Sequence, residues 1–419
     1  MKFTPALFEC MRSYSKSQLV KDIIAGIIVA IIALPLSIAL AIASGVGPQI
    51  GLYTAIVAGF LISLLGGSRV QIAGPTAAFA GIVAGIVAEK GMNGLVIATL
   101  MAGAVLVLMG LLRLGGLIRF IPHTITVGFT SGIALTILIG QLKDFFGLTF
   151  THSPVETVEK IEEVFATFST VNLTAVAVGV ASLLILILLP KLLPKVPASL
   201  VAVIIMALAV KLFSLDVNTI GSLYPDMPLG LPKLALPSFE GVDIVGLIPD
   251  AVTIAVLAAV ESLLSCVVAD KMIDAKHNSN VELVAQGVGN IGSALFGGIP
   301  ATGAIARTAA NIKNGGRTPI AGMVHAIMLL GVLAIFMPYA SLIPMPTIAA
   351  VLFVVAYNMS EWREFVGIVK KPSLTDTFVL ILTFVLTVVF DLVVAIAVGL
   401  VVHYVIFFIK KIGKDKNNG

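Results

Sequence analysis

The chain has 419 residues, of which 58% are hydrophobic and only 11% are charged. A soluble domain carries about a quarter charged residues, so this composition excludes an ordinary soluble protein. The formal net charge of +4 is too small for a protein that binds nucleic acid. At about 20 apolar residues per spanning helix, the chain accommodates roughly a dozen spans. We therefore predict an all-α polytopic membrane protein surrounded by lipid.

Fourteen apolar segments, separated by charges, turn residues or Pro/Gly breaks, are predicted to cross the membrane. The first seven are 22–42, 50–65, 76–88, 93–112, 121–140, 173–189 and 197–213. The second seven are 247–269, 281–296, 303–313, 319–337, 345–358, 374–389 and 392–409. Segment 154–168 has apolar residues at helical spacing and glutamates elsewhere, which predicts an amphipathic helix outside the membrane.

An even number of spans places both termini on the same side of the membrane. Both termini are basic, with Lys2, Arg12, Lys16 and Lys21 at the start and Lys410, Lys411, Lys414 and Lys416 at the end. Because cytoplasmic segments are enriched in Lys and Arg, we expect residues 1–21 and 412–419 in the cytoplasm. Residues 22–411 then form a multi-pass domain in the inner (plasma) membrane.

The two halves of the chain resemble each other. Asp22 opens DIIAGIIVAIIALPLS and Asp250 opens DAVTIAVLAAVESLLS, while PTAAFAG from Pro75 matches ATGAIAR from Ala301 at a similar offset. Each half holds seven predicted spans. Because seven is odd, the second half enters the membrane from the opposite face. The pattern predicts a seven-plus-seven inverted repeat, which is common in secondary transporters.

The third span of each half is broken. Segments 69–74 (RVQIAG) and 297–300 (GGIP) are too short, polar or Gly/Pro-rich for a membrane helix, so spans 3 and 10 are predicted to be a strand followed by a half-helix. The inversion points the two half-helix N-termini at each other. Each N-terminus carries unpaired N–H groups and a charge of about +0.5, with the hydroxyls of Thr76 and Thr302 beside them. This geometry suits an anion.

Two ionisable residues lie inside predicted spans, Arg307 in the second half-helix and Glu261 in AVLAAVESLLSCVVA. A charge there costs about several kcal/mol unless it is paired or solvated. One interpretation is that the two residues pair with each other or with backbone to fix helix packing. The functional interpretation makes Arg307 a positive charge near the anion and Glu261 a site for a proton or coupling ion.

Smaller residues near these charges are further candidates. Ser265, one turn after Glu261, either shares a cation with it or bonds the carbonyl four residues earlier. Gly81 and Gly85 suit close helix packing.

Motifs for ATP hydrolysis and hydrolase chemistry are absent from the sequence, which holds no GxxxxGK[ST], HExxH or GxSxG pattern. Its two cysteines, Cys10 and Cys266, suggest neither a disulfide framework nor a Cys-based metal site. We therefore expect a gradient-driven transporter that is not an enzyme and needs no cofactor, with sodium as a candidate coupling ion.

Four stretches closely resemble the SulP (sulfate permease) family of anion transporters. They are ESLLSCVVAD from Glu261, HNSNVELVAQGVGNI from His277, FGGIPATGAIARTAANIKNGGRTP from Phe296 and IPHTITVGFTSGIAL from Ile121. The resemblance implies a core domain (about 22–112 and 247–337) that moves against a gate domain (about 121–213 and 345–409). It also implies a homodimer.

The resemblance further implies an anion site between the third and tenth spans, at Thr76, Ala77, Thr302, Gly303 and Arg307. It places Glu261 at the coupling carboxylate, so that Glu261, Ser265 and Thr302 would hold a sodium ion. SulP proteins usually carry a C-terminal cytoplasmic STAS domain, whereas this sequence ends in KKIGKDKNNG about ten residues after its last predicted span. Whether that domain was removed or is naturally absent stays open.

The sequence thus predicts a secondary active transporter of a small inorganic oxyanion, sulfate or bicarbonate, coupled to a proton or sodium gradient and working by elevator-like alternating access. Proton-coupled dicarboxylate transport and an uncoupled anion channel are the alternatives. A nucleobase–cation symporter would share the inverted fold, but Arg307 favours an anion. The residues distinguish neither sulfate from bicarbonate nor proton from sodium.

Overall fold

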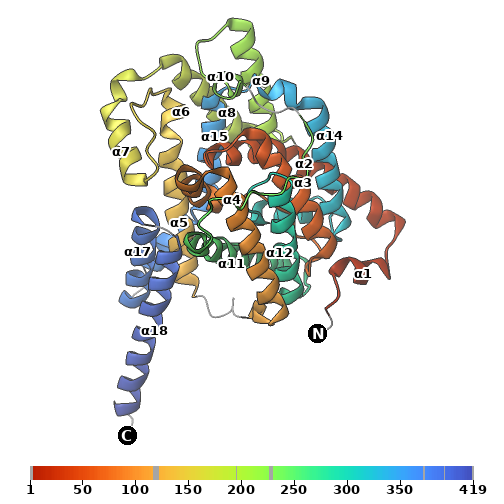
Figure 1. The fold of residues 1–419 in the computed structure, drawn as a ribbon, viewed down its shortest axis with the longest axis vertical. Helices are drawn as coiled ribbons and strands as arrows, with labels where there is room; N and C mark the ends of the chain where they lie inside the picture. Colours follow the sequence, from red (N-terminus) through yellow and green to blue (C-terminus); the bar gives the residue numbers. More distant parts are fainter. Residues whose placement is uncertain are drawn as a thin grey trace.

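The computed structural model describes residues 3–116, 122–194, 196–225, 230–370, 373–390 and 392–417. Nearly all regular structure in this part of the chain is helical, and the exceptions are two strands of two residues each. Figure 1 shows the helices bundled around one another, with α7 at one edge of the molecule.

The elements of the first half are α1 (Ala6–Met11), α2 (Lys16–Ala43), α3 (Pro48–Leu65), β1 (Ala73–Gly74), the 3₁₀ helix η1 (Ala77–Phe79), α4 (Ala80–Leu111), α5 (His123–Gly140), α6 (Leu142–Phe146), α7 (Thr157–Ala166), η3 (Phe168–Thr170), α8 (Leu173–Leu192), α9 (Ala198–Phe213) and α10 (Ile220–Leu223). Those of the second half are η4 (Val245–Leu247), α11 (Ile248–Ile273), α12 (Ser279–Leu295), β2 (Thr302–Gly303), α13 (Ile305–Lys313), α14 (Ile320–Ala340), α15 (Met345–Met359), α16 (Trp362–Val369), α17 (Leu374–Val389) and α18 (Leu392–Asn417).

Each of the fourteen predicted apolar segments overlaps a helix of the structure. Segments 76–88 and 93–112 both fall on α4, which Gly91 breaks with the backbone angles φ 67° and ψ 179°. Glycine adopts such a conformation without steric cost, so one glycine separates two helices that follow each other without a loop.

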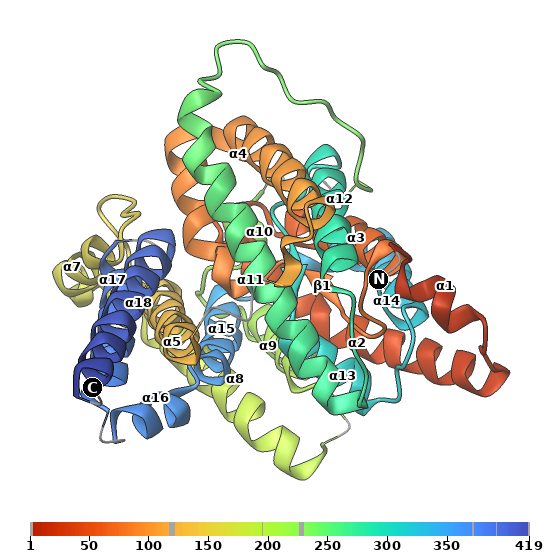
Figure 2. The same ribbon diagram turned by 90° about the horizontal axis from the view of Figure 1, so that it is seen from below.

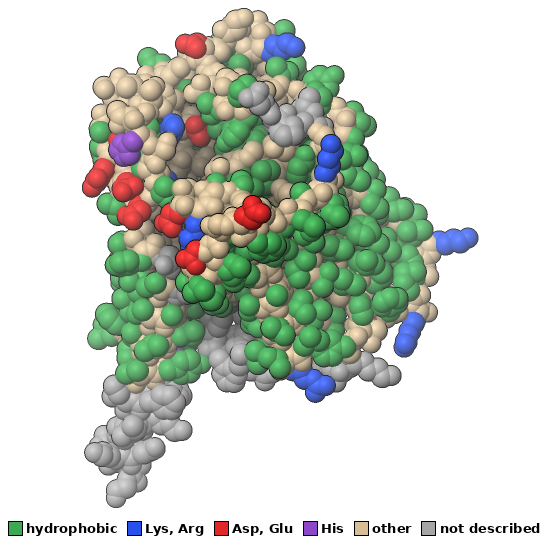
Figure 3. All heavy atoms as spheres, in the orientation of Figure 1, with side chains coloured by type: hydrophobic (Ala, Val, Ile, Leu, Met, Phe, Trp, Pro, Cys, Tyr) green, Lys and Arg blue, Asp and Glu red, His purple; other side chains and the backbone are tan. Residues whose placement is uncertain are grey.

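Within the described residues, seven helices are long and apolar enough to cross a membrane: Lys16–Ala43, Pro48–Leu65, Ala77–Leu111, His123–Phe146, Leu173–Leu192, Val245–Ile273 and Ile320–Ala340. Apolar side chains also cover much of the outer surface in Figure 3. On α8, for example, Leu184, Ile187 and Leu188 are exposed. A surface of this kind is stable against lipid tails and costly against water. The chain is therefore a multi-pass membrane protein.

The helices pack in two groups. In the first group, α2 and α3 pack on α14, and α11 and α12 pack on α4 in the equivalent way. This equivalence is what a repeat that relates α2–α4 to α11–α14 predicts. In the second group, α17 packs on α5 and α18, while α15 packs on α8 and α5. Figure 2 shows α5, α17 and α18 on one side and α4, α11 and α12 on the other.

Candidate functional site

Two short strands bring together the starts of two helices. β1 and β2 pair antiparallel, with Ala73 opposite Gly303 and Gly74 opposite Thr302. Because the strands run in opposite directions, η1 and α13 leave the pair at opposite ends and direct their N-termini toward it. This arrangement matches the predicted pair of facing half-helices.

The position of the second strand differs from the prediction. β1 lies inside predicted segment 69–74, but β2 follows predicted segment 297–300 instead of lying in it. Gly297 has φ 74°, and the Gly298 N–H donates to the Ser293 carbonyl at 2.7 Å, so this segment forms a turn. Pro300 has no N–H to donate to a strand partner.

Neither helix start is capped by a side chain. Thr76 is the N-cap residue of η1 and Ala304 that of α13, and neither side chain bonds a helix N–H. The first N–H groups of a helix have no partner inside the helix, so those of Ala77 and of the first turn of α13 face the space around the strand pair. Together the two starts supply a charge of about +1.

Arg307 adds a full charge beside these starts. It lies in the first turn of α13 and is only 2% exposed. Its Nη2 donates to the Pro75 carbonyl, while its Nε and Nη1 have no hydrogen-bond partner in the described part of the chain. A Cβ at Gly74 would lie 2.5 Å from Arg307 Nη1, so the guanidinium packs directly on the β1 backbone. Buried N–H donors of this kind nearly always have partners.

Glu261 lies on α11 and contacts the first helix start, because the Thr76 hydroxyl donates to its Oε2 at 3.0 Å. Within the described residues, Glu261 and Arg307 form no ion pair within 4.0 Å. The interpretation that these two charges pair with each other is therefore wrong. Arg307 does bond backbone, at the Pro75 carbonyl, and both its structural role and its role in anion binding stay predictions.

The other predicted hydroxyls have partners of their own. Thr302 donates to the Ala258 carbonyl of α11 at 3.0 Å. Ser265 donates to the Thr308 hydroxyl at 3.5 Å. Ser265 thus faces α13. Because the hydroxyl hydrogens of Thr302 and Thr76 are already donated, these two side chains can only accept from, or coordinate, a further ligand through their oxygen lone pairs.

Sequence reasoning missed a buried polar network that fixes β1. The Glu282 carboxylate accepts hydrogen bonds from the Gly67 and Ser68 N–H groups at 2.9 and 3.1 Å, and from the Gln71 amide at 2.8 Å. A Cβ at Gly303 would overlap the Gln71 amide, so β2 packs closely on this network. The signal in the sequence is an acidic residue near the start of the apolar segment 281–296, Glu282 in NVELVAQ, which lies in the first turn of α12.

Asparagines hold the chain on both sides of the strand pair. Asn290 of α12 exchanges two hydrogen bonds with the Ala301 backbone, at 2.9 and 2.8 Å. Asn311 of α13 donates to the Val70 carbonyl at 2.9 Å. These bonds satisfy backbone groups of the segments that lead into the two strands, which have no sheet partner of their own among the described residues.

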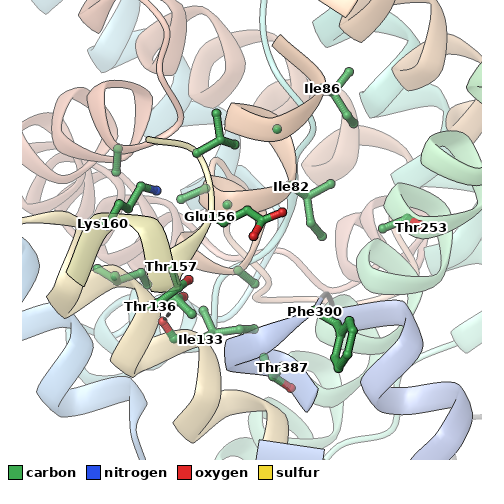
Figure 4. Close-up of a pocket in the computed structure, with 18 of the residues that line it drawn as sticks. Ile82, Ile86, Ile133, Thr136, Glu156, Thr157, Lys160, Thr253, Thr387 and Phe390 are labelled. Atoms are coloured by element: carbon green, nitrogen blue, oxygen red, sulfur yellow. Dashed lines mark hydrogen bonds between the residues drawn. The ribbon is translucent and has the colours of Figure 1, made fainter. Parts of the chain in front are cut away.

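A cavity of about 460 Å³ lies next to η1 and α4 (Figure 4). Its lining includes Ala78, Ala80, Gly81 and Gly85, but not Arg307. A Cβ at Gly81 or Gly85 would meet no atom within 4 Å. The expectation that these two glycines serve close helix packing is therefore wrong, since they face open space.

Comparison with known proteins gives a consistent result. The sequence profile of the sulfate permease family matches residues 19–383. The chain is 45% identical over 404 residues to the putative sulfate transporter YvdB of Bacillus subtilis (strain 168), covering 96% of this chain and 76% of YvdB. It is 33% identical over 326 residues to the bicarbonate transporter BicA of Synechocystis sp., covering 75% of this chain and 57% of BicA.

Solved structures show the same fold. The transmembrane domain of a cyanobacterium bicarbonate transporter BicA superposes with a TM-score of 0.81 at 30% identity, covering 91% of this chain and 98% of that domain. The murine anion transporter Slc26a9 superposes with a TM-score of 0.85 at 16% identity, covering 97% of this chain and 71% of that one.

Proposed function

The chain belongs to the sulfate permease (SulP) family of anion transporters, and we propose that it is a secondary active transporter of a small inorganic oxyanion, sulfate or bicarbonate. The relatives named above as sulfate and bicarbonate transporters support both substrates. The absence of nucleotide-hydrolysis motifs from the sequence supports transport driven by an ion gradient.

One observation carries this proposal: the buried Arg307 guanidinium has unpartnered N–H groups beside two uncapped helix starts. The anion would bind there to the backbone around Thr76, Ala77, Thr302 and Gly303 and to the guanidinium. The hydroxyls of Thr76 and Thr302 already donate to other acceptors. The donors for the anion therefore come from backbone and from Arg307.

Glu261 would be the coupling site. Two helix starts and Arg307 supply a charge of roughly +2, which an ionised Glu261 reduces to roughly +1. A dianion such as sulfate therefore favours a protonated Glu261, whereas a monoanion binds with Glu261 ionised or neutralised by sodium. Because Thr76 touches both the carboxylate and the first helix start, occupancy of one site alters the other.

For sodium, the lone pairs of Thr76 and Thr302 fit a hard cation that prefers oxygen ligands. Ser265 joins this set only if its hydroxyl turns away from Thr308. These contacts leave a proton and a sodium ion as rival coupling ions at Glu261.

Transport would follow elevator-like alternating access in the seven-plus-seven inverted repeat. The core (about 22–112 and 247–337) would move against the gate (about 121–213 and 345–409), with both termini cytoplasmic in the inner (plasma) membrane and two copies forming a homodimer. The packing of the helices in two groups supports two such bodies. The cavity at their boundary supports a path between them.

Counterflow in proteoliposomes tests the proposal. Vesicles loaded with unlabelled sulfate or bicarbonate are diluted into a lower concentration of the labelled anion, with no imposed proton or sodium gradient and with the membrane potential held at zero. A carrier accumulates label transiently because its site exchanges one anion for another. Flux of either anion without transient accumulation would favour the uncoupled channel, and flux of dicarboxylates alone would favour the dicarboxylate transporter.

A further inference from the structure

The cavity described above, which we call the outer cavity, lies at the boundary of the two helix groups. One wall comes from α4 with Gly81, Ile82 and Gly85. The facing wall comes from α5 and α17, and the residues that lead into α7 cover one side (Figure 4). Because the walls belong to different groups, relative movement of the groups would change the cavity.

The floor of the outer cavity reaches the anion site from one side. Ala78 belongs to η1, and Ala80 begins α4. Both residues follow Thr76, the N-cap residue of η1. An anion in the cavity is thus separated from the proposed site by the first turn of one half-helix. Arg307 does not line the cavity, so an anion held in the cavity does not contact the guanidinium.

The described lining carries four charged side chains, one cation (Lys160) and three carboxylates (Glu89, Glu156 and Asp250). Asp250 is already paired with Lys90 at 2.5 Å. Among the described residues, Lys160 forms no ion pair within 4.0 Å and is the only Lys or Arg in the lining. Glu156 lies four residues earlier, and both side chains border the cavity in Figure 4. Partial burial lowers the pKa of Lys160 from its ordinary value, while Glu159 opposes this change. An anion would replace solvation that this ammonium has lost.

We propose that the outer cavity is a capture site for the transported anion, in which Lys160 makes the first contact, while the carboxylates of Glu89 and Glu156 weaken binding by repulsion and so favour release toward the core. This inference rests on the proposed function. Gly81 and Gly85 keep the site wide, because side chains at these positions would project into it. The ligand is a small inorganic oxyanion, since the described lining offers a single unpaired cation and four threonine hydroxyls to bind it, and its carboxylates would repel a larger polyanion.

Thiol labelling tests the cavity without any transport. Gly85→Cys is introduced, with Cys10 and Cys266 buried and protected, and its modification rates are measured with an anionic and a cationic methanethiosulfonate of similar size. Adding Lys160→Gln should lower the ratio of anionic to cationic rates about two- to fivefold, the range for one exposed or half-exposed charge. Adding Lys143→Gln is the matched control, because that ammonium lies over the Phe150 ring outside the cavity.

Two labelling results would overturn the proposal. One is an unreactive Gly85→Cys in folded protein, which would show that the cavity is closed. The other is a rate ratio that Lys160→Gln leaves unchanged, or that the Lys143 control changes equally.

Transport kinetics then test capture itself. Lys160→Gln should raise the KM for anion supplied on the α7 side about two- to fivefold with Vmax unchanged. Glu156→Gln should lower KM, and Lys160→Arg should retain it. An unchanged KM with an altered labelling ratio would refute capture by Lys160. If the wild-type protein moves no anion, the proposed function fails, and the labelling ratios still decide whether Lys160 attracts anions to the cavity.

Discussion

Replacement of Arg307 by alanine should weaken anion binding by about 3 kcal/mol. A unit charge at about 4 Å contributes roughly 4 kcal/mol at an effective dielectric constant of about 20, and a hydrogen bond to a charged group contributes about 1.5–3 kcal/mol. In the Arg307→Ala variant the two helix starts still supply about half of the positive charge of the site, so anion binding is weakened and not abolished. We therefore expect the Kd for sulfate or bicarbonate to rise roughly 100-fold, since every 1.4 kcal/mol is tenfold.

Equilibrium binding of labelled anion to purified protein measures this change, with thermal unfolding as the check on folding. Arg307→Lys keeps the charge but loses the planar guanidinium and should bind between the two extremes. Arg317→Ala is the matched control, because this guanidinium bonds the Ile312 and Gly316 carbonyls at the far end of α13. A folded Arg307→Ala protein with wild-type Kd would refute the proposed site.

Three further predictions concern the strand pair, the coupling site and α7. Gly303→Ala should lower the free energy of unfolding by about 1–3 kcal/mol, because the added methyl group overlaps the buried Gln71 amide. Gly81→Ala should leave the free energy of unfolding unchanged, because Gly81 faces open space, and equal losses in the two variants would refute the packing argument. Glu261→Gln should abolish gradient-driven accumulation while counterflow continues, since an amide neither exchanges a proton nor carries the negative charge that would hold a sodium ion; preserved accumulation would remove Glu261 from coupling. Hydrogen bonds from Thr151 lower the pKa of Glu163, so their contribution to stability is present above the ordinary carboxyl pKa and is lost as pH falls through the lowered one. A spin label on α7 should become mobile on acidification, and Thr151→Val should make it mobile at neutral pH; a label equally ordered at all pH values in both proteins would refute this account.

Much of the fold could be predicted from the sequence, because spanning helices depend on local hydrophobicity. All fourteen apolar segments overlap helices. The boundary at Gly91 was also predictable as a gap between two spans, although the chain needs no loop there. The second strand was misplaced because a Gly/Pro run is compatible with both a strand and a turn, and the turn forms because the Gly298 N–H donates to the Ser293 carbonyl at the C-terminal end of the preceding helix, α12.

The site could be predicted only in part, because its contacts join distant parts of the chain. The half-helix pattern led to Thr76 and Thr302, and the cost of a buried charge led to Glu261 and Arg307. The partners of these side chains, such as Ala258 for Thr302, depend on packing that no local pattern records.

Glycines and buried networks were harder to interpret. The sequence suggests that Gly81 and Gly85 allow close helix packing, yet both line a cavity. A glycine is compatible with either role, because the absence of a side chain permits close contact and also leaves space open. The role of Glu282 cannot be predicted locally, because its backbone donors, Gly67 and Ser68, lie more than 200 positions away in the sequence.

The most direct test of the central claim is uptake of labelled sulfate and of labelled bicarbonate into proteoliposomes, under an imposed proton gradient and separately under an imposed sodium gradient. Our account predicts that one anion accumulates above equilibrium under one gradient, and that Arg307→Ala removes this accumulation. Absence of uptake of both anions under both gradients by well-folded protein would contradict it.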